Sequence, residues 1–253
     1  MAATERLWCI VPAAGSGRRF GADIPKQYLA LAGKPMIEHT LERLAACAEV
    51  TGFVVVLADG DMYWPGIASV RGKPVRTATG GAERSGSVLS GLRALPAEVG
   101  ADEFVLVHDA ARPCVAADDV ALLVARGIPA GGALLATPVR DTLKRGNGER
   151  RVAATEPRES LWRALTPQMF RRGELTGALE AADAAGVAVT DEAMAMERIG
   201  ARPLLVEGAE DNIKVTTAAD LALAAYLLRH ERYIRRPRER GTTSCMLHRS
   251  ESR

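Results

Sequence analysis

Glycines and cations follow the first apolar run of the chain within one short stretch. Gly15 and Gly17 let the backbone turn tightly and bring N–H groups against an oxyanion, since glycine has no Cβ. Arg18, Arg19 and Lys26 add the positive charge that neutral amides lack. This combination predicts a cradle for a polyphosphate, and hence a nucleotide site.

Two familiar glycine loops differ from this one in spacing. A dinucleotide fingerprint has a third small residue where this chain has Phe20, and an acid about 20 residues further on, whereas Asp59 comes much later. A P-loop ends in Gly-Lys-Ser/Thr, which nothing directly after Gly17 matches. The spacing therefore disfavours a dehydrogenase and a P-loop NTPase. A plain strand-to-helix turn is the simplest alternative to a nucleotide loop.

A second polar cluster closes the hydrophobic run at residues 104–108. Asp109 can meet Mg²⁺ or a hydroxyl, and Arg112 can meet a phosphate. Ala110 and Ala111, between them, allow a ligand to approach closely. The structural alternative is a capping aspartate that pairs with a nearby arginine.

Further segments place polar groups among apolar neighbours. Residues 80–87 open a helix with glycines and hydroxyls, and backbone groups there can read the edge of a base. Residues 165–168 and 190–192 carry further hydroxyls, amides and acids. Lys214 has an apolar residue on each side. It either points inward at a phosphate or is an exposed lysine on an edge strand, and the sequence leaves both readings open.

Length and composition place limits on the class of protein. With 253 residues, 47% of them apolar and 25% charged, the chain fits one large α/β domain. No apolar run approaches the roughly 18 residues that cross a bilayer, and the first residues do not form a secretory segment, so we expect a cytoplasmic protein that binds no membrane. The cysteines and histidines show no metal or redox spacing, which predicts reduced thiols and no protein-only metal site.

Charge is concentrated at the end of the chain. Residues 229–253 contain eight arginines and three acids, a balance of +5, so the preceding part carries −3 of the net +2. Few large apolar groups occur there, and we expect a basic, mobile tail after a single domain at residues 1–228. No aromatic residue interleaves the arginines of 235–240, which disfavours a nucleic-acid arm.

The order of apolar runs predicts the fold class. Runs at residues 7–11, 53–57, 104–108 and 133–136 alternate with helical patterns, which is typical of an α/β protein. We expect a mostly parallel sheet covered on both faces, with ligands beyond the carboxyl ends of its strands. The loops that follow residues 11 and 108, and the loop that precedes residue 83, should converge there.

The alternation of apolar runs and helical patterns stops at about residues 138–158, where polar segments flank Asn147 and Gly148. This pattern predicts a hairpin whose turn has positive φ at these two residues. An isolated two-stranded ribbon is only marginally stable in water, so a second subunit is an economical surface for it to rest on.

The motifs occur in one order between about residues 7 and 228, and together they resemble the 2-C-methyl-D-erythritol 4-phosphate cytidylyltransferases of non-mevalonate isoprenoid synthesis. The matching segments are residues 12–19, 25–28, 80–81, 108–113, 138–142, 161–168, 190–192 and 211–216. The resemblance implies a Rossmann-like nucleotidyltransferase domain with a mostly parallel central sheet and a protruding β-arm that builds a homodimer. It also implies CTP and methylerythritol phosphate as substrates and Mg²⁺ as the divalent cation.

The resemblance also implies roles for residues at the matching positions. Three cations would carry catalysis: Arg19, Lys26 and Lys214. CTP would be bound by Ala13, Ala14, Gly15, Ser16, Gly17, Gly81, Ala82, Ser87 and Ala110. The sugar-alcohol phosphate would be bound by Asp109, Arg112, Thr142, Arg158, Thr166 and Thr190, with Thr142 and Arg158 coming from the partner's arm. Asp109 would also meet the metal, and Ala82 replaces an aspartate that is frequent in the family.

The implied reaction is an in-line attack of a phosphate oxygen on the α-phosphorus of CTP, with departure of pyrophosphate. Positioning and charge neutralisation would carry it, and no general base is needed. Two alternatives remain at this point. One is a cytidylyltransferase for ribitol 5-phosphate, and the other is a regulatory module that binds a nucleotide without turnover.

Overall fold

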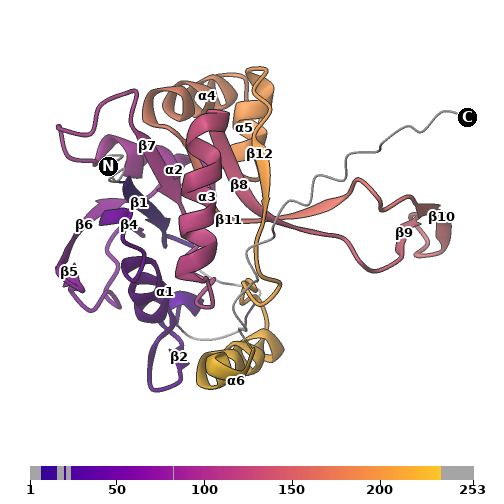
Figure 1. Ribbon diagram of the computed structural model, residues 1–253, viewed down its shortest axis with the longest axis horizontal. Helices are drawn as coiled ribbons and strands as arrows, with labels where there is room; N and C mark the ends of the chain where they lie inside the picture. Colours follow the sequence, from indigo (N-terminus) through magenta and orange to yellow (C-terminus); the bar gives the residue numbers. More distant parts are fainter. Residues whose placement is uncertain (1–6, 16–19, 21–23, 82, 235–253) are drawn as a thin grey trace, which may run out of the picture.

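The computed structural model describes residues 7–15, 20, 24–81 and 83–234. Its centre is an eight-stranded sheet with the strand order β12-β8-β11-β7-β1-β4-β6-β5 (Figure 1). These strands are β1 (Leu7–Pro12), β4 (Val50–Leu57), β5 (Ser69–Val70), β6 (Lys73–Thr79), β7 (Phe104–Val107), β8 (Gly132–Pro138), β11 (Trp162–Arg171) and β12 (Leu204–Glu207). The helices are α1 (Met36–Ala45), α2 (Arg84–Arg93), α3 (Ala117–Ala130), α4 (Arg172–Ala184), α5 (Glu192–Arg198) and α6 (Ala218–Ile234).

The sheet is mostly parallel, as predicted. β1 lies parallel to β4 and β7, β4 lies parallel to β6, and β8 lies parallel to β12. β11 is the exception, because it runs antiparallel to both β7 and β8. Residues 165–168 were expected to be polar site residues, and their polar character concealed this strand.

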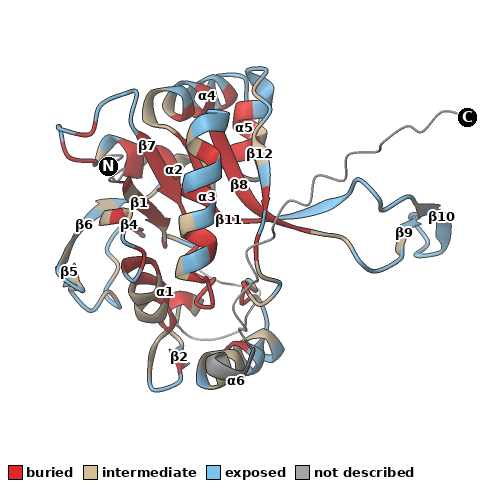
Figure 2. Cartoon of the chain, viewed as in Figure 1, coloured by how far each residue is buried: buried red, intermediate tan, exposed pale blue. Residues whose placement is uncertain are grey.

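Side chains of β1 alternate between the two faces of the sheet, and each face has its own core. Cys9 and Val11 pack with Leu41 of α1 and Leu123 of α3. Ile10 packs on the opposite face with residues of α2, α4 and α5. Figure 2 shows that most of the length of the central strands is buried. Because helices cover both faces, the polar site residues can reach solvent only at an end of the sheet.

The predicted arm is present and projects away from the sheet (Figure 1). Its tip consists of the antiparallel strands β9 (Leu143–Gly146) and β10 (Val152–Glu156), and it is largely exposed (Figure 2). Its base continues directly from β8 and returns into β11. The arm is therefore an extension of two neighbouring strands of the central sheet.

The predicted turn geometry at the tip of the arm is wrong. Positive φ occurs at Arg150 (60°), and neither Asn147 nor Gly148 adopts it. The Asn147 side chain instead accepts hydrogen bonds from the backbone N–H groups of Glu149 and Arg151, at 3.0 and 2.9 Å. A side-chain acceptor of this kind stabilises a wider turn, so the two-residue turn expected from the sequence is not needed.

The last described helix, α6, runs to Ile234 and thus beyond residue 228, where the sequence analysis ended the domain. The rest of the basic tail, residues 235–253, lies outside the described residues. Among the helices that the structure describes, none combines the length and the apolar character of a membrane span.

Candidate active site

Three loops converge at the carboxyl ends of β1, β4 and β7, as predicted. The backbone N–H of Ala13 donates to the carbonyl of Val56, and that of Gly80 donates to the carbonyl of Leu57, both at 2.7 Å. A Cβ at Gly80 would lie only 2.5 Å from the Cβ of Ala14. The glycine loop after β1 and the loop before α2 are therefore in direct contact.

The loop before α2, which contains Gly80 and Gly81, packs closely against the start of that helix. A Cβ on Gly81 would lie 3.1 Å from the backbone carbon of Gly86. Ser87 is buried, and its hydroxyl donates to the carbonyl of Glu83 at 3.1 Å. The glycines thus bring the start of α2 against the first loop. Four residues assigned to the nucleotide or to catalysis, Ser16, Gly17, Arg19 and Ala82, lie outside the described residues.

Lys26 begins a short 3-10 helix, η2 (Lys26–Tyr28), that bridges two parts of the site. The Nζ of Lys26 donates to the carbonyl of Val215 at 3.0 Å. The side-chain amide of the buried Gln27 donates to the carbonyl of Ala13 at 2.6 Å. This segment therefore joins the end of β1 to the loop that carries Lys214.

Asp109 lies at the centre of a cluster of cations directly after β7. Its Oδ2 is 2.9 Å from Nζ of Lys214 and 3.5 Å from Nε of Arg112. Its Oδ1 accepts from Nε of Arg84 at 3.1 Å. Burial raises the pKa of Asp109, but the opposing charges of Arg84, Lys214 and Arg112 outweigh it and hold this pKa well below its usual range. The carboxylate is thus ionised at neutral pH, and the cluster is net positive.

His108, beside Asp109, is fully buried and serves the fold. Its Nε2 is 3.1 Å from the carbonyl of Arg112, which can only accept, so Nε2 carries the proton. Its Nδ1 therefore accepts from the Thr166 hydroxyl at 3.0 Å, and that hydroxyl accepts from the backbone N–H of Asp109 at 3.1 Å. Burial lowers the pKa of His108 to about 4. A neutral histidine thus fixes Thr166 against Asp109.

Lys214 lies in a loop, so the alternative of an edge-strand lysine is wrong. The loop is fixed on both sides of Lys214. The backbone N–H of Val215 donates to the carbonyl of Ala111 at 2.8 Å, and Arg112 donates to the carbonyl of Asn212 at 2.8 Å. The Lys214 side chain itself is 39% exposed. It therefore combines a fixed backbone with an ammonium group that a ligand can reach.

Three of the remaining assigned residues lie outside this cluster in a single chain, namely Thr142, Arg158 and Thr190. Thr142 and Arg158 belong to the projecting arm and are exposed, and Arg158 donates to the carbonyl of Arg140. Thr190 is exposed just before α5, with its backbone N–H 3.4 Å from the sulfur of Met194. Ala110 is buried beside Asp109.

Arg84 and Glu192 belong to the cluster, yet sequence reasoning gave them no role. Arg84 is the first residue of α2, and Glu192 is the first residue of α5. Burial lowers the pKa of Arg84, but the carboxylates of Glu192 and Asp109 outweigh it and raise this pKa above its usual value. Each residue lies within a segment that the sequence had singled out, residues 80–87 and 190–192, but no sequence pattern joins two positions so far apart.

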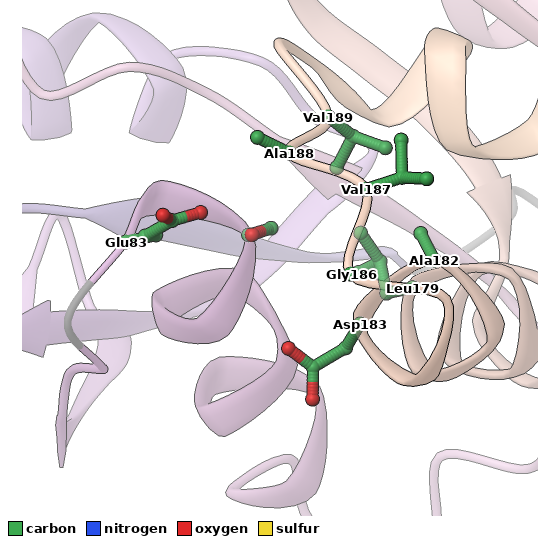
Figure 3. A pocket seen from close by; sticks show the side chains of 9 residues that line it. Glu83, Leu179, Ala182, Asp183, Gly186, Val187, Ala188 and Val189 are labelled. Atoms are coloured by element: carbon green, nitrogen blue, oxygen red, sulfur yellow. The ribbon is translucent and has the colours of Figure 1, made fainter.

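A pocket of about 180 Å³ lies between the start of α2 and the loop at residues 186–189 (Figure 3). Glu83, Ser85 and Asp183 supply its polar side chains, and the rest of its lining is mainly apolar. None of the residues assigned to chemistry lines it. We therefore place no substrate in this pocket.

Comparison with known proteins agrees with this geometry. The family model of 2-C-methyl-D-erythritol 4-phosphate cytidylyltransferase matches residues 7–230. The chain belongs to this family. A family protein of that name from Xanthomonas axonopodis pv. citri (strain 306) is 61% identical over 221 residues, which are 87% of this chain and 83% of the relative.

Solved structures of the family share the fold. A crystal structure of 4-diphosphocytidyl-2C-methyl-D-erythritol synthase has a TM-score of 0.77 at 33% identity and covers 89% of this chain and 100% of its own. The family member from Francisella tularensis has a TM-score of 0.75 at 32% identity, with 88% and 99% covered. The fold is thus the Rossmann-like nucleotidyltransferase fold of this family, as the sequence predicted.

The contact between the two glycine loops leads to a prediction. Gly80→Ala places a Cβ against Ala14 and Ser87, so one loop must move. We expect a loss of about 1–3 kcal/mol in the free energy of unfolding, and at least a tenfold loss of affinity for CTP, the nucleotide expected from the sequence. Urea denaturation and titration calorimetry measure the two effects.

Gly100→Ala is the matched control, because a Cβ there meets nothing within 4 Å. It should leave CTP affinity unchanged. Equal CTP binding by both alanine variants would contradict the assignment of the Gly80 loop to the nucleotide site.

Proposed function

We propose that this protein transfers the CMP group of CTP to 2-C-methyl-D-erythritol 4-phosphate, giving 4-diphosphocytidyl-2-C-methyl-D-erythritol and pyrophosphate in the non-mevalonate isoprenoid pathway. One observation carries the proposal. In a member of this family, Arg112 and Lys214 contact Asp109 where β7 ends, and Lys26 contacts the loop that carries Lys214. A net positive site of this kind suits a reaction between two anions.

The reaction consists of a single displacement. An oxygen of the sugar-alcohol phosphate forms a bond with the α-phosphorus of CTP, and the bond from this phosphorus to the bridging oxygen breaks. Pyrophosphate leaves with that electron pair. A phosphate monoester is mostly dianionic near neutral pH, so the nucleophile needs no general base. The mechanism therefore requires no proton transfer from the buried, neutral His108.

The two substrates repel each other, and the chain must offset this repulsion. Lys26 and Arg19 are proposed to hold the triphosphate, and Lys214 the attacking phosphate. The bond from Lys26 to the carbonyl of Val215 places its amine beside the Lys214 loop. Both lysines can thus serve one transition state. Cytosine is proposed to lie against Ala13, Ala14, Gly81 and Ser87, where the absence of a glycine Cβ lets the two loops pack closely.

Mg²⁺ is proposed as the divalent cation. Within the described residues, no group of three His, Cys, Asp or Glu side chains could hold a metal ion. Asp109 is one carboxylate, already shared by three cations. Mg²⁺ commonly binds through one or two carboxylates together with substrate phosphates and water, and Asp109 is the carboxylate proposed to meet it. When bound with the triphosphate, the ion would neutralise phosphate charge.

A homodimer is proposed to complete the site. Thr142 and Arg158 lie on an exposed arm that projects from its own sheet, so a partner's site is the place where they can serve (Figure 1). In the partner's site they would bind the sugar-alcohol phosphate together with Arg112, Thr166 and Thr190. A cytoplasmic location is proposed as well, because CTP is an intracellular nucleotide.

Pyrophosphate release tests the proposed function. Each of the four nucleoside triphosphates is supplied with methylerythritol phosphate or with ribitol 5-phosphate. We expect release with CTP and methylerythritol phosphate, and little release with other pairs. Preference for ribitol 5-phosphate would favour the alternative enzyme. Binding of CTP without release would indicate a regulatory module.

Lys26→Ala should reduce kcat by about a hundredfold or more, because no neutral neighbour replaces a cation that meets the transition state. Steady-state kinetics measure the loss, and circular dichroism checks folding. Lys34→Ala is the control, since Lys34 pairs with Glu42 on the surface and belongs to no assigned site. Normal turnover by a folded Lys26→Ala variant would remove Lys26 from the mechanism.

Mixed dimers test whether Arg158 acts in the partner's site. In a dimer of one Lys26→Ala chain and one Arg158→Ala chain, one site then receives both an intact Lys26 and an intact Arg158. Mixing two weakly active variants should restore about a quarter of normal activity, since half of the dimers are mixed and each has one good site. No gain on mixing would place Arg158 in its own chain's site.

A further inference from the structure

An ion pair between a fully buried carboxylate, Glu192, and a partly exposed guanidinium, Arg84, lies next to Asp109. Glu192 has 0% exposure, and both its carboxylate oxygens accept from Arg84, at 2.5 Å from Nη1 and 3.1 Å from Nη2. A two-point contact of this kind fixes the plane of the guanidinium as well as its position. The orientation of Arg84 is thus set by the first residue of α5.

The third nitrogen of the same guanidinium reaches the reaction site. Nε of Arg84 donates to Oδ1 of Asp109 at 3.1 Å, while Oδ2 of Asp109 faces Lys214 at 2.9 Å and Arg112 at 3.5 Å. The two oxygens of Asp109 thus have different partners. A continuous chain of contacts leads from Glu192 through Arg84 and Asp109 to the proposed catalytic Lys214.

Joining the helices does not by itself require this buried pair. An exposed salt bridge between Arg93 of α2 and Glu180 of α4, with a distance of 2.8 Å, already connects α2 to another helix on the same face of the sheet. Burying a carboxylate and a guanidinium has a large desolvation cost, and apolar residues of similar volume are often as stabilising. Unlike the exposed bridge, the Arg84–Glu192 pair is largely buried and also contacts the site through Asp109.

We propose that Arg84 and Glu192 are positioning residues for the transfer reaction, which fix Asp109 so that its second oxygen alone is shared between Lys214 and Arg112. This inference deepens the proposed function and rests on it. By occupying Oδ1, Arg84 also weakens the hold of Asp109 on Lys214. The Lys214 ammonium is then free to exchange part of its contact with Asp109 for contact with the attacking phosphate.

The roles of charge and of geometry are separable. Arg84→Lys keeps the positive charge. A single amine, however, cannot reproduce the planar guanidinium, which bonds both oxygens of Glu192 and Oδ1 of Asp109 at the same time. Glu192→Gln keeps the shape and the packing but removes the negative charge that orients the guanidinium. Arg93→Met is the matched control, because it removes an arginine of the same helix whose partner is exposed.

The experiment measures kcat and both KM values for the wild type and these variants, with thermal unfolding alongside. We expect Arg84→Lys and Glu192→Gln each to lower kcat/KM for methylerythritol phosphate at least tenfold, with the KM for CTP within about twofold. Arg93→Met should match the wild type. Equal kinetics of Arg84→Lys and wild type would overturn the inference.

A double-variant cycle provides a readout that a merely structural role would not change. If Glu192 acts through Asp109, then Glu192→Gln should change kcat/KM less than twofold once Asp109→Asn is present. Losses that multiply independently would overturn the inference, as would losses that follow the unfolding temperature alone. Turnover by the wild type separates the proposed function from the positioning role. If the wild type releases no pyrophosphate, both are defeated. If the wild type turns over normally and the Arg84 and Glu192 variants are unaffected, only the positioning role is defeated.

Discussion

The site depends on one ionised carboxylate that is shared among three cations where β7 ends. Asp109 is buried, so its charge is tolerated only because Arg84, Arg112 and Lys214 surround it. The same arrangement keeps three positive groups close together without strong mutual repulsion. Each of these cations comes from a different loop or helix start, and the shared anion is what brings the loops together.

The fold separates the apolar side chains of the strands from the polar side chains of these loops. Apolar side chains of the central strands alternate between two cores, which leaves the polar chemistry only the ends of the strands. Hydrogen bonds between backbone groups then fix the loops to each other, as between Val215 and Ala111. The long side chains of Lys26 and Lys214 extend from this fixed backbone. The fold fixes their backbone positions, and their ammonium groups contact the carbonyl of Val215 and the carboxylate of Asp109, respectively.

Much of this was predictable from the sequence, and the exceptions have physical causes. The parallel strands were visible as apolar runs, and the convergence of the glycine loops with Asp109 followed from the topology. β11 was missed because Thr166 and Gln168 interrupt its apolar pattern, although both side chains are buried and hydrogen-bonded. Arg84 and Glu192 were missed for another reason. A buried ion pair between two helix starts leaves no periodic signal, and only the tertiary structure brings its members together.

The arm is continuous with β8 and β11, and β11 lies directly beside β7. Trp162 pairs with Pro138 at the base of the arm, and a few residues further along the same strand Thr166 touches His108 and Asp109. One strand therefore forms both the base of the arm and the wall of the site that carries Thr166. The direction in which the arm projects and the place of the Thr166 hydroxyl are set by the same ten-residue strand.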